Sequence, residues 1–298
     1  MATLYTAIDS NKRQTIIIMI VFIVFISLLA YVFGEGSGYG IEWTGLAIIV
    51  SGLMSFSGYY FSDKIVLGIS GAREVKKEDN PQLYNLVENL CIGAGLPLPR
   101  IYTIEDTAPN AFATGRDPQH AVICFTTGIL SKLNKMELEG VVAHELSHIG
   151  NYDTRLMSIV VVLVGIVVLM SDWFRRFLWF GGGRKRDRDS GQLGAILAIV
   201  GIVLAILSPI FAELMKLALS RQREYLADAS ASLLTRYPEG LASALEKIAA
   251  DREPLEVANK ATAHLYIINP LKDHKGSLNS LFSTHPPVEE RIARLRNV

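Results

Sequence analysis

Two histidines four residues apart, with a glutamate beside the first, are the residues of this chain best suited to chemistry. They form the run His144-Glu145-Leu146-Ser147-His148. Side chains four residues apart lie one above the other on a helix face, so both imidazoles can reach a single metal ion. Glu145 is rotated by about 100° around the helix axis, which places its carboxylate beside the open position of the ion. The bland alternative is a solvated helix face that carries two histidines.

A third ligand is needed, because a catalytic zinc usually has three protein ligands and a water. Glu224 and Asp228 follow a later apolar run and are again one helical turn apart. Glu224 can bind the ion, while Asp228 can accept the second ring N–H of a ligand histidine and fix its tautomer. Alone, this stretch is typical of a charged helix end. Together with the histidine pair, it predicts one Zn²⁺ site per chain, held by His144, His148 and Glu224.

The elements that must position these groups are helices and a small sheet. An amphipathic helix is predicted from about Asn134, with Glu137 as its capping-box partner. Further helices are predicted at residues 80–94, 234–250 and 289–296. Short β-like runs at residues 100–104, 111–114 and 121–126, with a turn at Asp117-Pro118 before the last, predict a small antiparallel sheet.

Apolar residues are clustered along the chain. They make up 50% of all residues, and the mean hydropathy of +0.30 is high for a soluble protein. Residues 16–33 and 41–61 are long enough to cross a bilayer as helices, and two further apolar runs occupy residues 156–170 and 194–219. The first run is expected to be an uncleaved anchor, because no small-residue cleavage site follows it. The later two runs either span the membrane or are buried helices.

The charge pattern predicts an orientation. Lys12 and Arg13 precede the first run, whereas the loop at residues 34–40 carries Glu35 and no basic residue. By the positive-inside tendency, the N-terminus and the chain from residue 63 onward face the cytoplasm. The basic loop at residues 175–188 conflicts with two further full crossings, so the run pair 156–219 either overrides the rule or only dips into the membrane.

The expected fold class is therefore α+β and mainly α-helical, with membrane helices and a zincin-like catalytic domain that contains a small β-sheet. We expect a transmembrane helix pair at residues 1–62, a first catalytic part at 63–155, an apolar hairpin at 156–219 and a second catalytic part at 220–298.

Net charge and cysteine content exclude other classes of protein. The chain has 29 basic and 29 acidic residues, which gives no overall attraction to nucleic acid. Cys91 and Cys124 are its only cysteines, and neither has the spacing of a disulfide framework or a metal site, so both are interpreted as small apolar fillers.

Four features together resemble the HtpX-type heat-shock membrane zinc metalloproteases, which are gluzincin-like and related to the CAAX prenyl proteases. These features are the N-terminal helix pair, the run Asn110-Ala111-Phe112-Ala113-Thr114-Gly115, the zinc motif followed by apolar runs, and Ser283-Thr284-His285-Pro286-Pro287 with Glu290-Arg291. The likeness covers nearly the whole chain and shows no departure at the metal positions.

The resemblance implies roles that spacing alone does not give. It implies an edge strand that binds an extended substrate through its backbone, which tolerates many side chains; its residues are Asn110, Ala111, Phe112, Ala113 and Thr114. It also places His285 and Arg291 near the active site, with His285 as a catalytic group that stabilises the oxyanion. From the residues alone, His285 before two prolines is more typical of a surface turn.

The expected activity is zinc-dependent hydrolysis of peptide bonds, with Glu145 as the base that takes a proton from water. Both halves of the site adjoin apolar runs, so the zinc should lie near the cytoplasmic surface of a plasma (inner) membrane. There it can reach unfolded or damaged membrane proteins, which fits the role of the resembled family in quality control and stress response.

Three rival functions remain open at this point. A dedicated peptidase for lipidated peptides would share the site, and cleavage of unmodified casein-like substrates would distinguish the two. A non-catalytic scaffold with a structural zinc has no need of Glu145. A transporter-like protein is disfavoured because the apolar runs carry few charges for an ion path.

Overall fold

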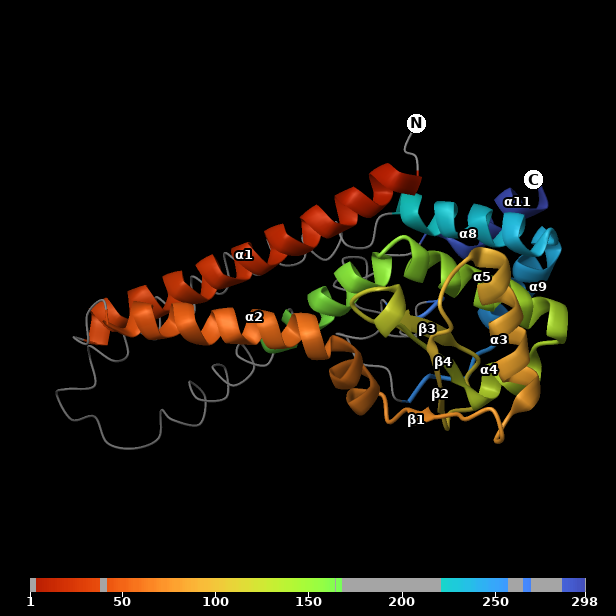
Figure 1. Ribbon diagram of the computed structural model, residues 1–298, viewed down its shortest axis with the longest axis horizontal. Helices are drawn as coiled ribbons and strands as arrows, with labels where there is room; N and C mark the ends of the chain where they lie inside the picture. The colour runs from red at the N-terminus through yellow and green to blue at the C-terminus, as the bar shows by residue number, and fades with distance from the viewer. Residues whose placement is uncertain are drawn as a thin grey trace.

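The computed structural model describes residues 4–37, 42–163, 165–167, 221–256, 265–268 and 286–297. Two parts are visible in Figure 1: a long helical hairpin, and a body in which helices surround a small sheet. The N-terminal end of the hairpin lies against the body, and the end where α1 stops and α2 starts lies far from it. This arrangement places the start of the first helix beside elements that come much later in the chain.

The hairpin consists of α1 (Leu4–Ser37) and α2 (Glu42–Ile69). Both are long and apolar enough to cross a membrane, over Ile8–Val32 and Thr44–Ile69. Large apolar side chains on them are exposed to the surroundings, as expected for a surface that faces lipid; Val24 and Ile49 are 60% and 63% exposed. The prediction of two N-terminal membrane-length helices is confirmed, and both are longer than the apolar runs at 16–33 and 41–61.

A further helix, Asp153–Val167, begins the third apolar run and meets the preceding helix at an angle of 80°. Taken as one bent span, the pair would raise the number of candidate spans among the described residues to three. The remainder of that run and the whole of residues 194–219 lie outside the described residues.

The sheet has four strands in the order β1-β2-β4-β3. They are β1 (Arg73–Glu74), β2 (Arg100–Ile104), β3 (Ala111–Thr114) and β4 (Val122–Thr126). The predicted strands are present, and β3 and β4 pair antiparallel across the predicted turn. The sheet as a whole is mixed and not antiparallel, because β2 and β4 pair in parallel. After β2 the chain forms β3 at the outer edge of the sheet and then returns to form β4 between β2 and β3. The parallel neighbours β2 and β4 are therefore not consecutive in the sequence.

Helices α3 (Pro81–Ala94), α4 (Thr127–Lys132) and α5 (Lys135–Gly150) cover one side of the sheet. The predicted capping box of α5 is present: the Asn134 side chain accepts from the Glu137 N–H at 3.0 Å, and Glu137 accepts from the Asn134 N–H at 2.9 Å. This cap fixes where α5 starts, and therefore which of its residues face inward.

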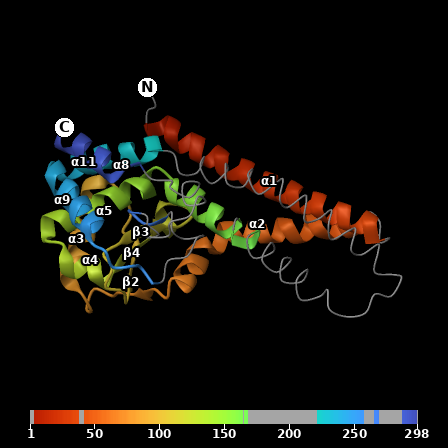
Figure 2. The same ribbon diagram turned by 180° about the vertical axis from the view of Figure 1, so that it is seen from behind.

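Three helices complete the body: α8 (Arg221–Thr235), α9 (Pro238–Ala250) and α11 (Val288–Arg296). They lie together with α5 at the end of the molecule away from the hairpin turn (Figure 2). The single helix predicted at residues 234–250 is instead divided, because Arg236 adopts a left-handed φ of 53° and Pro238 starts the next helix. Gly140 permits close packing of α5 on α9, since a Cβ there would lie 2.6 Å from the Leu241 nitrogen.

Two apolar cores flank the sheet. One joins its strands to α3, α5 and α9, with Ile123 and Val142 fully buried. The other joins Phe112 and Cys124 to α1, α2 and the helix Asp153–Val167. Cys91 and Cys124 are both buried and free, as their interpretation as apolar fillers requires. The second core shows that the membrane hairpin is packed into the body.

Candidate metal centre

Helix α5 brings its two histidines to the same buried point. The Nε2 atoms of His144 and His148 lie 3.1 Å apart, and the rings are nearly perpendicular at 89°. The side chains are 1% and 5% exposed. Two ring nitrogens directed at each other at this distance are the arrangement expected for ligands of one ion.

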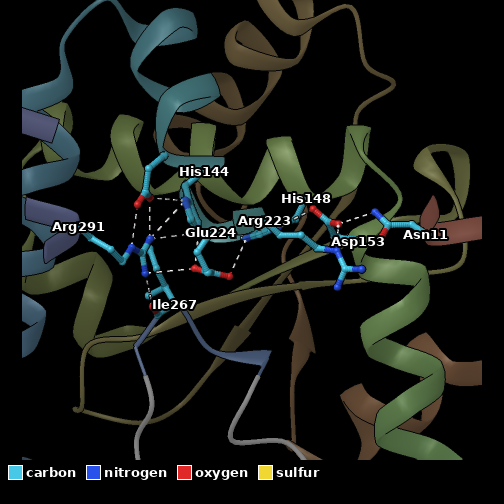
Figure 3. A network of polar contacts seen from close by, with 9 residues as sticks. Asn11, His144, His148, Asp153, Arg223, Glu224, Ile267 and Arg291 are labelled. Carbon is cyan, nitrogen blue, oxygen red and sulfur yellow. Dashed lines mark hydrogen bonds and ion pairs between the residues drawn. The ribbon is translucent and has the colours of Figure 1, made fainter. Parts of the chain in front are cut away.

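Glu224 on α8 supplies the third donor group (Figure 3). Its Oε2 lies 3.6 Å from His144 Nε2, and its Oε1 lies 3.5 Å from His148 Nε2. The three ligand atoms all lie within 4.8 Å of one another. Zinc bonds of 2.0–2.1 Å at tetrahedral angles separate ligand atoms by about 3.3 Å, so the spacing of these donors fits a zinc ion.

The charge of the surrounding groups also fits a divalent cation. Four buried carboxylates and two largely buried guanidinium groups lie in and around the site; they are Glu145, Asp153, Glu224, Asp228, Arg223 and Arg291. With both histidines neutral, these groups carry two excess negative charges. A divalent ion neutralises this excess, which burial would otherwise make costly.

Each ligand histidine is oriented by a carboxylate that is not itself a ligand of the metal. Asp228 Oδ1 lies 2.9 Å from His144 Nδ1, and Asp153 Oδ2 lies 3.0 Å from His148 Nδ1. Each carboxylate holds the Nδ1 proton, so that Nε2 is left as the metal-binding atom. Burial acts against protonation of His148, but Asp153 and then Glu224 outweigh it and raise its pKa to about 9. Protons therefore compete with zinc for this ring.

Arg291 on α11 is buried behind Glu224 and Asp228. Its Nε and Nη2 donate to the two oxygens of Asp228 at 2.9 and 2.7 Å, and its Nη1 lies 3.2 Å from Glu224 Oε2. Nη1 also donates to the Ile267 carbonyl at 3.0 Å. Although burial opposes it, Arg291 holds the pKa of Asp228 well below its usual range. The guanidinium thus holds the ligand Glu224 and also Asp228, which orients the ligand His144.

Glu145 is only 2% exposed and lines a cavity beside His144, His148 and Glu224. The volume of this cavity is about 10 Å³, roughly the space of one water molecule. Burial raises the pKa of Glu145, and the neighbouring histidines offset part of that rise. A carboxylate with a raised pKa beside a single water is suited to exchange protons with it.

The strand β3 forms the edge of the sheet nearest the metal centre, and Ala113 lines the same cavity. Its first residues are covered: Ile267 N–H donates to the Ala111 carbonyl at 3.0 Å, and Asn110 Nδ2 donates to the Ile268 carbonyl at 3.1 Å. Tyr266 packs edge-on against Phe112. At the far end, Thr114 exchanges a hydrogen bond with Ser158 at 2.7 Å.

The structure places most of the expected site residues together. One cluster is formed by His144, Glu145, His148, Glu224, Asp228 and Arg291. Of the expected substrate strand Asn110–Thr114, Ala113 lines the cavity of this cluster, and His285 lies outside the described residues. Sequence reasoning missed Asp153, which follows His148 by five residues. A carboxylate shortly after the motif could have indicated this partner in the sequence. However, Asp153 reaches the His148 imidazole only because the chain bends sharply at residues 151–153.

Comparison with known proteins gives a consistent picture. The model of peptidase family M48 matches residues 77–298. A protein named "Protease HtpX homolog" from Dictyoglomus thermophilum is 49% identical over 294 residues, covering 99% of this chain and 94% of the relative. The protein of the same name from Lactobacillus acidophilus is 44% identical over 304 residues, covering 99% of this chain and all of the relative.

A solved structure is similar in fold. The crystal structure of S. mikatae Ste24p aligns with a TM-score of 0.50 at 17% identity. The alignment covers 91% of this chain but only 62% of Ste24p, so the chain spans less than two thirds of that protein. At this identity the likeness concerns the fold alone, and it agrees with the mainly helical architecture around a small mixed sheet.

Proposed function

Because this chain belongs to peptidase family M48, as an HtpX-type membrane zinc metalloprotease, we propose that it cleaves unfolded or damaged membrane proteins at the cytoplasmic face of the plasma membrane. This activity would serve protein quality control under stress. The observation that carries the proposal is the attachment of the zinc centre to the end of the membrane hairpin where α1 begins: Asn11 of α1 donates to Asp153, which in turn holds His148.

Basic and aromatic side chains gather where the hairpin joins the body, which supports a cytoplasmic site. Lys12 lies over the Tyr152 ring at 4.5 Å, Arg155 over Tyr59 at 5.4 Å, and Arg116 over Tyr60 at 5.2 Å. Tyrosines prefer the interface between lipid and water, and Lys and Arg favour the cytoplasmic side. The opposite end of the hairpin carries Glu35 and Glu42 and no basic residue at 34–41.

Substrate binding along β3 explains a loose sequence preference. Residues of an antiparallel strand alternate between pairing with the neighbour and facing away from it. Asn110 pairs with Thr126, and the carbonyl of Ala111 faces away from β4 toward Ile267. Ala113 faces the same way and lines the cavity of Glu145. We propose that an extended substrate pairs with the backbone at Ala113, beside the catalytic water.

Zinc, when bound, lowers the pKa of a coordinated water toward 7 and polarises the scissile carbonyl. His144, His148 and Glu224 would hold it, with their ring tautomers and charges fixed by Asp153, Asp228 and Arg291. The carboxylate of Glu145 takes a proton from the attacking water and delivers it to the leaving amine nitrogen. His285 is proposed, from the family resemblance, to donate a hydrogen bond to the developing oxyanion.

The proposal is tested with the full chain in liposomes and three substrates: unfolded casein, a folded soluble protein, and a membrane protein with a destabilised cytoplasmic loop. We expect cleavage of the first and third only, lost with a chelator and restored by zinc. If the protein ignores all unmodified chains and cleaves only a prenylated peptide, it is a dedicated processing peptidase and the proposed substrate class is wrong.

A further inference from the structure

The corner between α5 and the helix Asp153–Val167 carries a carboxylate of the zinc centre next to a strained residue. The two helix axes differ by 80°. The turn between them is made by Tyr152, whose φ of 61° lies in the left-handed region. Such a conformation is unfavourable for a non-glycine residue and persists only where the surroundings hold it. Asp153, the partner of His148, is the next residue.

All three residues of this corner are held by the first membrane helix. Asn11 Nδ2 donates to the Asn151 carbonyl at 2.9 Å and to Asp153 Oδ1 at 2.6 Å. Lys12 lies 4.5 Å from the centre of the Tyr152 ring. In Figure 3, Asn11 points from its helix straight at Asp153. The contacts on both sides of Tyr152 hold the turn that directs Asp153 back to His148.

The chemistry of Asn11 leaves little freedom in this contact. Asn11 is 1% exposed, and the cost of burying its amide in an apolar helix is offset by the two hydrogen bonds of Nδ2, while Oδ1 has no hydrogen-bond partner among the described residues. Both atoms it faces are acceptors, so the NH₂ group and not the oxygen must point at them. A continuous series of hydrogen bonds therefore runs from α1 through Asp153 to the ligand His148.

A second contact ties α1 to the other half of the metal centre. Arg223 precedes the ligand Glu224; its Nε lies 3.4 Å from Asp153 Oδ1, and its Nη2 donates to Gln14 Oε1 at 2.5 Å. Asn11 and Gln14 are three residues apart and lie on the same face of α1. The membrane helix thus contacts the segments that supply two of the three ligands.

We propose that Asn11 is a positioning residue of the zinc centre: it fixes Asp153, and through Asp153 the ring of His148, so that the first membrane helix is a component of the metal site. Removal of its amide frees the strained corner and lets Asp153 turn away from the imidazole. Loss of such an outer partner typically weakens metal binding by about 10–100-fold. One bond further out, the expected loss is roughly tenfold.

The test measures zinc affinity in the full chain in detergent, by competition with a chelator. Every variant also carries Glu145→Gln to prevent cleavage. The affinity measurement uses no substrate, so a negative result for Asn11 leaves the proposed substrate class untested by this experiment and unchanged. We expect Asn11→Leu, which keeps the number and branching of the side-chain heavy atoms but removes the donor, to weaken zinc binding about tenfold. Thr15→Val is the matched control: Thr15 is equally buried on α1, and among the described residues its hydroxyl bonds only the Asn11 carbonyl of its own helix.

A double-mutant cycle separates positioning from a general structural role. Asp153→Ala should weaken zinc, and adding Asn11→Leu to it should cause no further loss, because both act through one path. If the two effects are simply additive, or if Asn11→Leu leaves zinc affinity unchanged, the proposal is wrong. If Asn11→Leu folds poorly, Asn11→Ala replaces it, and its melting temperature is measured with and without zinc. A positioning role should lower the melting temperature of the zinc-loaded protein more than that of the zinc-free protein. An equal decrease in the two states would contradict the proposal.

Discussion

At the scale of single residues, the metal centre is a set of buried charges in which each group depends on a partner. Arg291 is the clearest case, since it is 1% exposed and bonds Asp228, Glu224 and a backbone carbonyl at once. Buried ion pairs cost desolvation when they form, but the loss of one partner leaves an uncompensated charge. Substitutions here should therefore be read as changes to the whole charge set.

Glu145→Gln tests the assignment of the base. The amide keeps the shape of the side chain but cannot accept the proton of the attacking water, so cleavage should fall by about 10²–10⁴-fold. The ligands are untouched, so metal analysis of the purified variant should still find one zinc per chain. Undiminished cleavage would remove Glu145 from the mechanism, and His144→Ala provides the contrast in which the metal itself is lost.

Arg291→Met tests the buried guanidinium. Asp228 and Glu224 lose their cationic partner without regaining water, so the metal-free protein should lose about 3–5 kcal/mol of unfolding free energy. The control is Arg296→Met on the same helix, because Arg296 pairs with Glu239 and Glu246 at the exposed surface. Urea unfolding of both variants decides the matter; equal losses would show that α11 as a whole, and not the charge, is responsible.

The three ligands were predictable, including Glu224 far along the chain, but the contacts that tie the site to α1 were not. His144 and His148 follow from helix periodicity, because four residues are one turn whatever the rest of the chain does. The hydrogen bonds of Asp153 to α1 depend on a chain bend and on a residue 142 positions away. The resemblance pointed to Arg291 near the site, but its bidentate contact with Asp228 is visible only in the structure.

At the scale of elements, α5 is the part whose placement decides the geometry of the centre. Its N-terminal cap is reinforced from outside, since Glu137 also accepts from Ser243 at 2.7 Å and from Lys247 at 2.8 Å. Burial works to raise the pKa of Glu137, but Lys247, Ser243 and the Asn134 N–H outweigh it and hold the pKa below its ordinary value. The carboxylate thus links the start of α5 to α9.

The pH dependence of stability should report this link. A depressed folded pKa gives stability that is present above the unfolded value of about 4.3 and is lost as the pH falls through the folded pKa. Glu137→Gln should therefore lower the unfolding free energy by about 2 kcal/mol at pH 7. The difference in unfolding free energy between the variant and the unsubstituted chain should become smaller below about pH 4. Unfolding curves from pH 3 to 7 measure it, with Glu139→Gln as the control on the same helix. A gap independent of pH would contradict the ion-pair account.

The edge strand β3 should make the enzyme sensitive to the backbone of its substrate. N-methylation removes one amide donor from a peptide without changing its side chains. We expect methylation next to the scissile bond to lower kcat/KM at least tenfold, while side-chain changes at the same position have smaller effects. Cleavage rates of a methylated peptide series, beside matched side-chain variants, provide the measurement. The reverse pattern would mean that pockets, and not β3, select the substrate.

Three of the four strands and the antiparallel pairing of β3 with β4 were predictable, but β1 and the parallel pairing of β2 with β4 were not. Alternation and turn residues gave β2, β3 and β4 almost to the residue. Strand order depends on which edges meet in three dimensions, and the parallel pairing of β2 with β4 required β3 to pass to the outside. Likewise, the left-handed Arg236 that separates α8 from α9 leaves no mark in a helical periodicity.

At the scale of the whole molecule, the hairpin and the body are one packed unit. Phe22 of α1 is fully buried in the core that includes Phe112 and Cys124 of the sheet. A catalytic body attached in this way cannot swing far from the membrane surface. The zinc centre is therefore held at the base of the hairpin.

Cysteine labelling in whole cells tests the orientation. Both native cysteines are buried, so they should give little background with an impermeant maleimide. Leu233→Cys, at a side chain that is 79% exposed on α8, should be labelled only after the membrane is permeabilised. Glu35→Cys, near the far end of α1, should be labelled in intact cells. The opposite result would place the zinc centre on the outer face.

The contact of Arg291 with Asp228 and Glu224 also has a consequence for the folding of the protein during its synthesis. During translation the ribosome makes Asn11 first, then the histidines, then Glu224, and Arg291 much later. A nascent chain that stops short of residue 291 already holds its ligands, but it lacks the cation that neutralises the carboxylates around them. The buried charges of the metal centre are therefore complete only once α11 has docked.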